Sequence, residues 1–208
     1  MITRRAAGRL ILAGSTLVPL SSAFAASLAP TPAQTEGPFY PTAFPADADN
    51  DLVQVRGAAA HARGTVLHLQ GRVLDVNGRP LQGATVEIWQ CDVNGIYDHP
   101  RQSGRERRDT AFQGFGRIVA DASGGYRFRT LKPVAYAGRS PHIHLKVATA
   151  DGRRLTSQFY LAGEPGNDRD FLFRNAADRA RERIEMKLTQ ANGIEAGAVA
   201  TTMDIVLA

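Results

Sequence analysis

The stretch Val-Leu-His-Leu-Gln-Gly-Arg-Val-Leu-Asp-Val-Asn-Gly-Arg-Pro, residues 66–80, decides the fold class. Apolar and polar side chains alternate along its first half, so that Leu67, Leu69 and Val73 fall on one face. A period of two residues is typical of a half-buried β-strand. The pair Asn77-Gly78 that follows is a strong signal for a tight turn. Residues 66–80 therefore predict a strand that ends in a turn.

Strand-like alternation recurs along the rest of the chain, without a long helical period and without an internal repeat. We expect further strands at residues 85–90, 117–120, 126–130, 142–150, 153–161, 184–188 and 203–207. Ser123-Gly124-Gly125 and Asp151-Gly152 supply turns between neighbouring strands. The one predicted helix covers residues 175–181, with Asn175 as its N-cap. The chain is therefore predicted to be all-β, a β-sandwich with long loops and one short helix.

The first 25 residues have the layout of a cleaved export signal. Arg4 and Arg5 form a twin-arginine pair, an apolar run covers residues 10–20, and Ala23-Phe24-Ala25 offers small residues to a signal peptidase. This order predicts a Tat-type signal peptide over residues 1–25 and an exported mature protein, periplasmic or secreted. The apolar run is too short to span a bilayer as a helix, so we expect no membrane association after cleavage.

The remainder divides into two segments by composition. Residues 26–64 are rich in Pro, Ala, Thr and Asp and show no apolar period, which predicts an extended N-terminal arm. Residues 65–208 carry the strand patterns and predict the β-sandwich domain. We expect the catalytic residues to lie in this second segment.

Charge and cysteine content narrow the functional classes. The formal net charge of the chain is +5, but residues 1–25 contain three arginines and no acid, which leaves 22 basic against 20 acidic side chains. A mature net charge of +2 does not predict nucleic-acid binding. The single cysteine, Cys91, excludes an internal disulfide, and we expect it to be buried.

The sharpest short motif is His142-Ile143-His144. Residues i and i+2 of a strand point to the same face, so the two imidazoles should lie side by side. Two neutral imidazoles are a common ligand pair for a metal ion. The pair by itself is equally compatible with a structural role.

Two tyrosines near this motif indicate which metal would bind. Tyr97 lies at the start of a long polar loop over residues 91–114, and Tyr136 lies six residues before His142. Tyrosinate is a hard anionic oxygen ligand, and together with imidazole nitrogen it suits Fe(III) better than zinc or copper. A trivalent ion would also deprotonate a phenol whose ordinary pKa is about 10.

Short motifs recur in a fixed order along the chain. They read QTEGPFYP at 34–41, GRVLDVNGRP at 71–80, VEIWQ at 86–90, NGIY at 94–97, FQGFGR at 112–117, YRFRT at 126–130, KPVAY at 132–136, HIH at 142–144 and SQFY at 157–160. Together they resemble the intradiol ring-cleavage dioxygenases, which include the protocatechuate and catechol dioxygenases. The resemblance runs from about Thr35 to the C-terminus and implies a β-sandwich with a prealbumin-like core.

The resemblance also implies roles for particular residues. The four protein ligands of a non-haem Fe(III) would be Tyr97, Tyr136, His142 and His144. Tyr136 would leave the metal when substrate binds, while Arg139 and Gln158 would lie beside the substrate ring. The implied reaction uses O2 to cleave a catechol-type ring between its two hydroxyl-bearing carbons, and gives a cis,cis-muconate-type product.

One departure from the family affects the expected substrate. Only Ala137 and Gly138 separate Tyr136 from Arg139, where better-known members carry a longer insertion. The substrate itself is therefore not carried over, although the chain looks nearer the protocatechuate 3,4-dioxygenase-like branch. A homo-oligomeric state is compatible with the sequence. The alternatives are a zinc or copper site, or a secreted prealbumin-like β-sandwich module that binds without catalysis.

Overall fold

Two five-stranded sheets form the body of the protein over residues 27–208, the part of the chain that this computed structural model describes. The first sheet consists of β1 (Val66–Asp75), β4 (Gly125–Leu131), β8 (Thr189–Gln190), β9 (Val199–Thr202) and β10 (Ile205–Leu207). β4 pairs antiparallel with β1, whereas β9 and β10 run parallel to its first half and to its end. The predicted signal, residues 1–25, lies outside the described residues.

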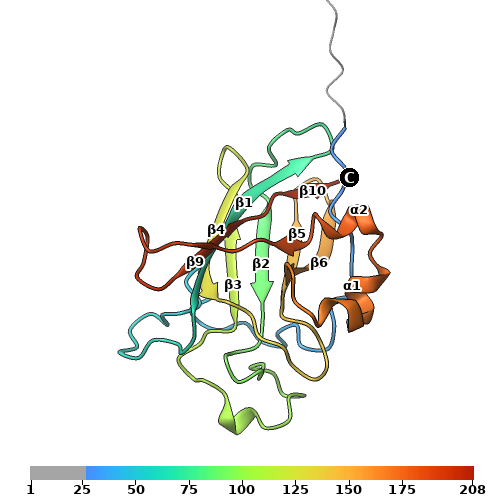
Figure 1. The fold of residues 1–208 in the computed structure, drawn as a ribbon. Coiled ribbons are helices and arrows are strands. Elements are labelled where there is room, and N and C mark those ends of the chain that lie inside the picture. The colour runs from blue at the N-terminus through green and yellow to red at the C-terminus, as the bar shows by residue number, and fades with distance from the viewer. Residues whose placement is uncertain (1–26) are drawn as a thin grey trace, which may run out of the picture.

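The second sheet has the strand order β3-β2-β5-β6-β7. Its members are β2 (Thr85–Trp89), β3 (Phe115–Val119), β5 (His142–Ala148), β6 (Arg154–Leu161) and β7 (Glu185–Met186). Neighbouring strands are antiparallel except for the last pair, in which β7 runs parallel to β6. The two sheets pack against each other (Figure 1), so the predicted β-sandwich is confirmed.

The core between the sheets is built from the alternating apolar residues. Leu67, Leu69 and Val73 of β1 are fully buried, as the alternation predicts. They belong to the same cluster as Val86 and Ile88 of β2. Each side chain of this size removed from water contributes roughly 1.5–3 kcal/mol to the free energy of folding. The tight turn predicted at Asn77-Gly78 is also present, because Gly78 donates to the carbonyl of Asp75 at 2.9 Å.

Gly71 lets the C-terminal segment approach β1 closely. Met203 lies between β9 and β10, and its N–H donates to the carbonyl of Gln70 at 2.8 Å. A Cβ placed on Gly71 would lie 1.8 Å from the carbonyl oxygen of Met203. The same oxygen accepts the hydroxyl of Tyr126 at 2.6 Å, which holds it in place. Only glycine therefore fits at this position of the sheet.

The helical prediction is wrong in its details. The described part of the chain has two short α-helices, α1 (Phe171–Asn175) and α2 (Asp178–Arg181), and two 3-10 turns, η1 (Arg105–Arg107) and η2 (Asn167–Arg169). Asn175 ends α1 instead of capping a helix, because the extended backbone of Ala176 interrupts the chain there. The N-cap of α1 is Asp170, whose carboxylate accepts the N–H groups of Leu172 and Phe173.

The strand predicted over residues 184–188 is shorter in the structure, where β7 covers only Glu185–Met186 and a separate short strand, β8, begins at Thr189. β7 pairs with β6 in the second sheet, whereas β8 pairs with β9 in the first. The chain crosses from one sheet to the other at Lys187 and Leu188. A period of two residues continues through this crossing, which explains why the sequence predicts one strand.

Residues 27–64 contain no helix or regular strand and run along both sheets (blue in Figure 1). The N–H of Leu28 donates to Val76, that of Thr31 to Val206 and that of Gln34 to Thr156, at 2.7–3.0 Å. Leu52 is fully buried in the main core. The segment is thus packed onto the sandwich as far as Val53, whereas most of residues 56–64 are exposed, and its boundary at residue 64 stays a prediction.

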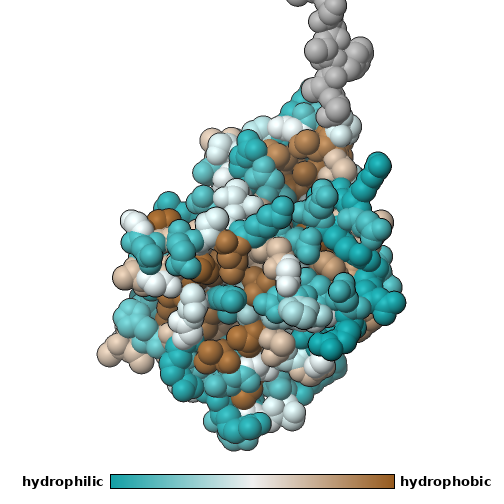
Figure 2. Space-filling model, in the orientation of Figure 1, coloured by the Kyte–Doolittle hydropathy of each residue, from teal (hydrophilic) through white to brown (hydrophobic). Residues whose placement is uncertain are grey.

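The surface carries only scattered apolar groups. Hydrophilic side chains cover the region of α1 and α2, and hydrophobic ones form small patches in the middle of the same face (Figure 2). The large exposed apolar side chains are Leu28, Phe44, Val119, Phe171 and Ile194. Within residues 27–208, no helix has the length and apolar character needed to cross a membrane.

The close approach at Gly71 generates a prediction about stability. Gly71→Ala should lower the free energy of unfolding by about 1–3 kcal/mol, because the added methyl group displaces the backbone of Met203. Urea denaturation would measure this loss. Gly193→Ala is the matched control, since a Cβ at Gly193 meets no atom of the described residues within 4 Å. Equal stability of the two variants would contradict the assigned contact.

Candidate active site

The two histidines of β5 form the centre of the site. His142 and His144 are each 1% exposed, while Ile143 between them points into the main core. The Nε2 atoms of the two imidazoles lie 3.2 Å apart. The same-face arrangement follows from the strand period, as the sequence predicts.

Each imidazole is held by a neighbour. Nδ1 of His142 donates to the carbonyl of Ser140 at 2.6 Å, which assigns its proton to Nδ1 and leaves a lone pair on Nε2. The ring of His144 stacks on the indole of Trp89, with centroids 4.8 Å apart and planes 8° apart. Nδ1 of His144 has no hydrogen-bond partner among residues 27–208.

Both imidazoles are neutral at pH 7. Burial lowers the pKa of His142 to about 4, and the charge of Arg139 acts in the same direction. Burial and the neighbouring His142 hold the pKa of His144 well below its usual range. Two buried neutral imidazoles whose Nε2 atoms face each other are suited to bind a cation.

Two phenols complete a cluster of four rings. Tyr97 is 2% exposed, and its ring centroid lies 5.0 Å from that of Tyr136 and 6.0 Å from that of His144. Tyr136 is half-buried and lies 5.4 Å from His142, centroid to centroid. Burial raises the pKa of both phenols above its usual value of 10. The four residues proposed from the sequence as metal ligands thus lie together.

A tight turn before β5 carries Tyr136. Ala137 has a φ of 45° and Gly138 a φ of 78°, both in the left-handed region. The N–H of Arg139 donates to the carbonyl of Tyr136 at 2.7 Å and closes the turn. The left-handed conformation is unfavourable for alanine by roughly 1–2 kcal/mol, so the surrounding contacts must hold this turn in place.

The loop that carries Tyr97 is fixed by Asp92. One carboxylate oxygen of Asp92 accepts the N–H groups of Asn94 and Ile96, at 2.8 and 3.0 Å. Gly95, between them, has a φ of 73°, and a Cβ there would lie 3.3 Å from Cβ of Tyr136. This turn therefore brings the two tyrosine-bearing segments into contact.

The N-terminal arm covers the site from another side. Phe39 stacks on Tyr97, with centroids 4.7 Å apart. A Cβ on Gly37 would lie 3.4 Å from Cε1 of His144, so the backbone of the arm comes close to the imidazole. The ring centroid of His99 also lies 5.6 Å from that of Phe39. Nδ1 of His99, however, already accepts the backbone N–H of Arg101. The sequence predicts that the hydrophobic side chain of Phe39 packs against the rest of the protein. It does not indicate that the partner is Tyr97.

Arg139 and Gln158 are also brought together beside the histidines. Nη2 of Arg139 donates to Oε1 of Gln158 at 2.9 Å and to the hydroxyl of Tyr160 at 3.1 Å. Nε of Arg139 donates to the carboxylate of Asp170 at 2.7 Å. Sequence analysis did not assign Tyr160 and Asp170 to the site. The only local signal for Asp170 is its suitability as a helix N-cap.

A pocket of about 660 Å³ opens beside Tyr136. Its lining includes Tyr136 and Arg139 from the turn, and Glu164, Gly166 and Arg169 from the segment after β6. Tyr97 does not line it. Tyr136 is therefore the phenol that an entering molecule meets first.

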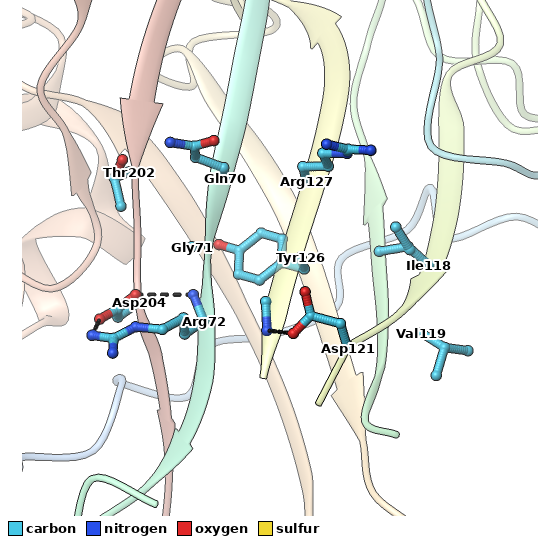
Figure 3. Close-up of a pocket in the computed structure, with 11 residues that line it drawn as sticks. Gln70, Gly71, Arg72, Ile118, Val119, Asp121, Tyr126, Arg127, Thr202 and Asp204 are labelled. Atoms are coloured by element: carbon cyan, nitrogen blue, oxygen red, sulfur yellow. Dashed lines mark hydrogen bonds and ion pairs between the residues drawn. The ribbon is translucent and has the colours of Figure 1, made fainter. Parts of the chain in front are cut away.

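A second pocket, of about 630 Å³, lies at the opposite end of the sandwich (Figure 3). It is bounded by β1, β3 and β4, and Val119 in its wall pairs with Thr85, at the far end of β2 from Trp89. Two of its charged residues, Arg72 and Asp204, form an ion pair in which Nη2 of Arg72 donates to the carboxylate of Asp204 at 2.8 Å. None of the proposed site residues lines it.

Comparisons with known proteins show which family the chain resembles. The model of a family described as "Dioxygenase" matches residues 35–208. The protocatechuate 3,4-dioxygenase beta chain of Burkholderia cepacia is 35% identical over 136 residues, which cover 62% of this chain and 58% of that protein. A catechol 1,2-dioxygenase of Acinetobacter baylyi is 29% identical over 149 residues, or 62% of this chain and 47% of that one. The chain thus spans about half the length of these curated relatives.

Solved structures show the same fold. The dioxygenase domain of a dioxygenase and carbohydrate-binding protein fusion from Streptomyces sp. SirexAA-E has a TM-score of 0.67 and 31% identity, over 86% of this chain and 98% of that one. A catechol 1,2-dioxygenase from Acinetobacter sp. ADP1 has a TM-score of 0.65 and 27% identity, over 85% and 62%. Taken with the family match over residues 35–208, these likenesses show that the chain belongs to the intradiol ring-cleavage dioxygenase family.

Proposed function

We propose that this protein is a non-haem Fe(III) intradiol dioxygenase that uses O2 to cleave a catechol-type ring between its two hydroxyl-bearing carbons. The product would be a cis,cis-muconate-type dicarboxylate. One observation carries the proposal: two neutral imidazoles with Nε2 atoms 3.2 Å apart lie in a buried cluster with two phenols. The family match supports the same reaction class.

The donor set fits a ferric ion. The hydroxyl of Tyr97 is buried and has no hydrogen-bond partner within the described residues, although a buried hydroxyl without one is costly. Burial also raises the pKa of both phenols, so a phenolate forms here only beside a strong positive charge. Tyr97, Tyr136, His142 and His144 would hold Fe(III). The bound ion would withdraw electron density from the catechol and so open its ring to O2.

The two tyrosines have different environments, which suggests different tasks. Tyr97 is enclosed beneath Phe39 and can stay in place throughout the reaction. Tyr136 is half-buried, lines the pocket and is carried by a surface turn. When it moves aside for substrate, its phenolate oxygen can accept a proton from a catechol hydroxyl.

Arg139 would stabilise negative charge on the bound ring. Its guanidinium lines the pocket, and Gln158 and Tyr160 hold one of its nitrogens. A fixed donor directed at developing charge typically contributes about 2.7–4 kcal/mol to the stability of a transition state. Trp89 and Phe39 cover the inner side of the cluster by stacking on His144 and Tyr97.

Removal of one hydroxyl tests the metal assignment. Purified protein should be red-brown through phenolate-to-iron charge transfer. Tyr97→Phe should weaken and shift this absorption, because Tyr136 remains as the second phenolate, and should lower turnover by at least about 100-fold. Visible spectra, iron analysis and O2 uptake with a panel of catechols would measure both. The control is Tyr126→Phe, which removes a buried hydroxyl outside the site. A folded, fully metal-loaded protein without colour would contradict the proposal.

Because the imidazoles are buried in their neutral form, the metal-free protein should become less stable at acidic pH. The pKa of His142 is about 4 when folded and about 6.5 when unfolded, so the unfolded state binds more protons between these values. The contribution of His142 to the free energy of unfolding should be fully present above pH 6.5. It should be lost as the pH drops towards 4, which lowers the free energy of unfolding by on the order of 3 kcal/mol for His142 alone.

Urea unfolding of the metal-free protein between pH 4 and pH 7 would measure this loss. His142→Gln should flatten the dependence, whereas His61→Gln, at an exposed histidine, should leave it unchanged. If the free energy of unfolding depended equally on pH in both variants, burial of His142 would not be the cause of the pH dependence.

We further propose that the protein is exported through the twin-arginine route, already folded. The support is the order of charged, apolar and small residues over 1–25. The exported protein should begin near residue 26, and replacement of Arg4 and Arg5 by lysine should retain it in the cytoplasm. N-terminal sequencing and fractionation would test this, and unchanged export of the lysine variant would refute it.

A further inference from the structure

Asp170 lies where three parts of the structure meet. Its side chain is fully buried at the N-terminus of α1 and accepts four hydrogen bonds. One carboxylate oxygen accepts the N–H groups of Leu172 and Phe173, at 3.0 and 3.2 Å. The other accepts Nε of Arg139 at 2.7 Å and the N–H of Ser140 at 2.9 Å. Capping of α1 thus uses only one of the two carboxylate oxygens.

The ion pair fixes the direction of the Arg139 guanidinium. Asp170 holds Nε, while Gln158 and Tyr160 hold Nη2. Nη1 has no hydrogen-bond partner among residues 27–208 and remains available to a molecule in the pocket. Two anchored nitrogens define the plane of a guanidinium, so the direction of the remaining N–H groups is set as well.

The same carboxylate is connected to the imidazole pair through Ser140. The N–H of Ser140 donates to Asp170, and its carbonyl accepts Nδ1 of His142 at 2.6 Å. The Ser140 hydroxyl bonds to Oδ1 of Asn167, in the segment that leads into α1. Asp170 thus anchors the residue that orients His142 together with the residue that would face the substrate.

A negative charge is needed here, and not only a hydrogen-bond acceptor. The Arg139 side chain is 14% exposed, so its charge is largely removed from water. Gln158 and Tyr160, its other partners, are neutral. Asp170 is the one carboxylate within ion-pair distance of Arg139 in the described part of the chain. Without it, an uncompensated guanidinium would turn towards the open pocket to regain water.

We infer that Asp170 is a positioning residue for the proposed reaction, which holds the Arg139 guanidinium in the direction that meets developing charge on the substrate. The inference rests on the proposed function, because only an anionic reacting group makes this direction useful. Asp170 itself does not line the pocket and acts through Arg139.

Two substitutions separate positioning from helix capping. Asn and Ser are as good N-caps as Asp, so Asp170→Asn and Asp170→Ser should keep α1 while removing the charge. We expect kcat for catechol cleavage to fall about 10–100-fold, with KM within threefold and iron content unchanged. Asp168→Asn, an exposed acid two residues away, is the matched control and should keep wild-type kcat.

A double-mutant cycle tests whether Asp170 acts through Arg139. In an Arg139→Gln background, Asp170→Asn should lower kcat less than twofold further. An equal fall in both backgrounds would overturn the inference, as would an Asp170→Asn variant with wild-type kcat. If both Asp170 variants fail to fold, the role of the carboxylate is structural and the inference falls.

A measurement on the metal-free protein keeps the inference distinct from the proposed function. The stability effects of Arg139→Gln and Asp170→Asn should be non-additive in urea denaturation, because the two side chains contact each other. Additive effects would overturn the pairing. Absence of ring cleavage by the wild-type protein would instead refute the proposed function, and the stability cycle would still report whether the pair is coupled.

Discussion

Two buried imidazoles whose Nε2 atoms lie 3.2 Å apart impose the constraint on which the rest of the site depends. His142 carries its proton on Nδ1, where Ser140 accepts it, so its Nε2 can only accept. A metal-free His144 satisfies the pair by carrying its proton on Nε2. A cation held by both rings would require that lone pair, and the proton of His144 would then be on Nδ1.

The sheet and the loops position different residues of the site. β5 holds the imidazoles on a strand paired on both sides, where their spacing is set by the sheet. The phenols come from two turns that contact each other at Gly95, and the arm closes the cluster through Phe39. The imidazole pair therefore belongs to the sheet, whereas Tyr136, the residue proposed to move, is carried by a surface turn. This division is usual where a scaffold supports chemistry.

The features that could be predicted from the sequence are those with local periodicity. Alternation located β1, β5 and β6, and the strand period placed His142 and His144 on one face. The helix was misplaced because the pattern contained a plausible cap at Asn175, while the actual cap at Asp170 also serves a tertiary contact.

Long-range pairings could not be predicted. Arg139 and Asp170 are 31 residues apart, and neither residue carries a local signal of the other. Phe39 and Tyr97 meet only because the arm crosses the end of the sheet. The division of residues 184–190 between two sheets depends likewise on which edge is free for pairing. Such contacts follow from topology, which a single sequence does not encode locally.

The stacking of Trp89 on His144 has a practical consequence. The chain contains a single tryptophan, so all indole fluorescence arises from the residue that lies face to face with an imidazole of the cluster. Its emission is therefore an intrinsic optical reporter of events at that ring. Binding of the proposed iron would quench this emission and a chelator would restore it, so that loading could be followed in real time without a label and at concentrations too low for absorption.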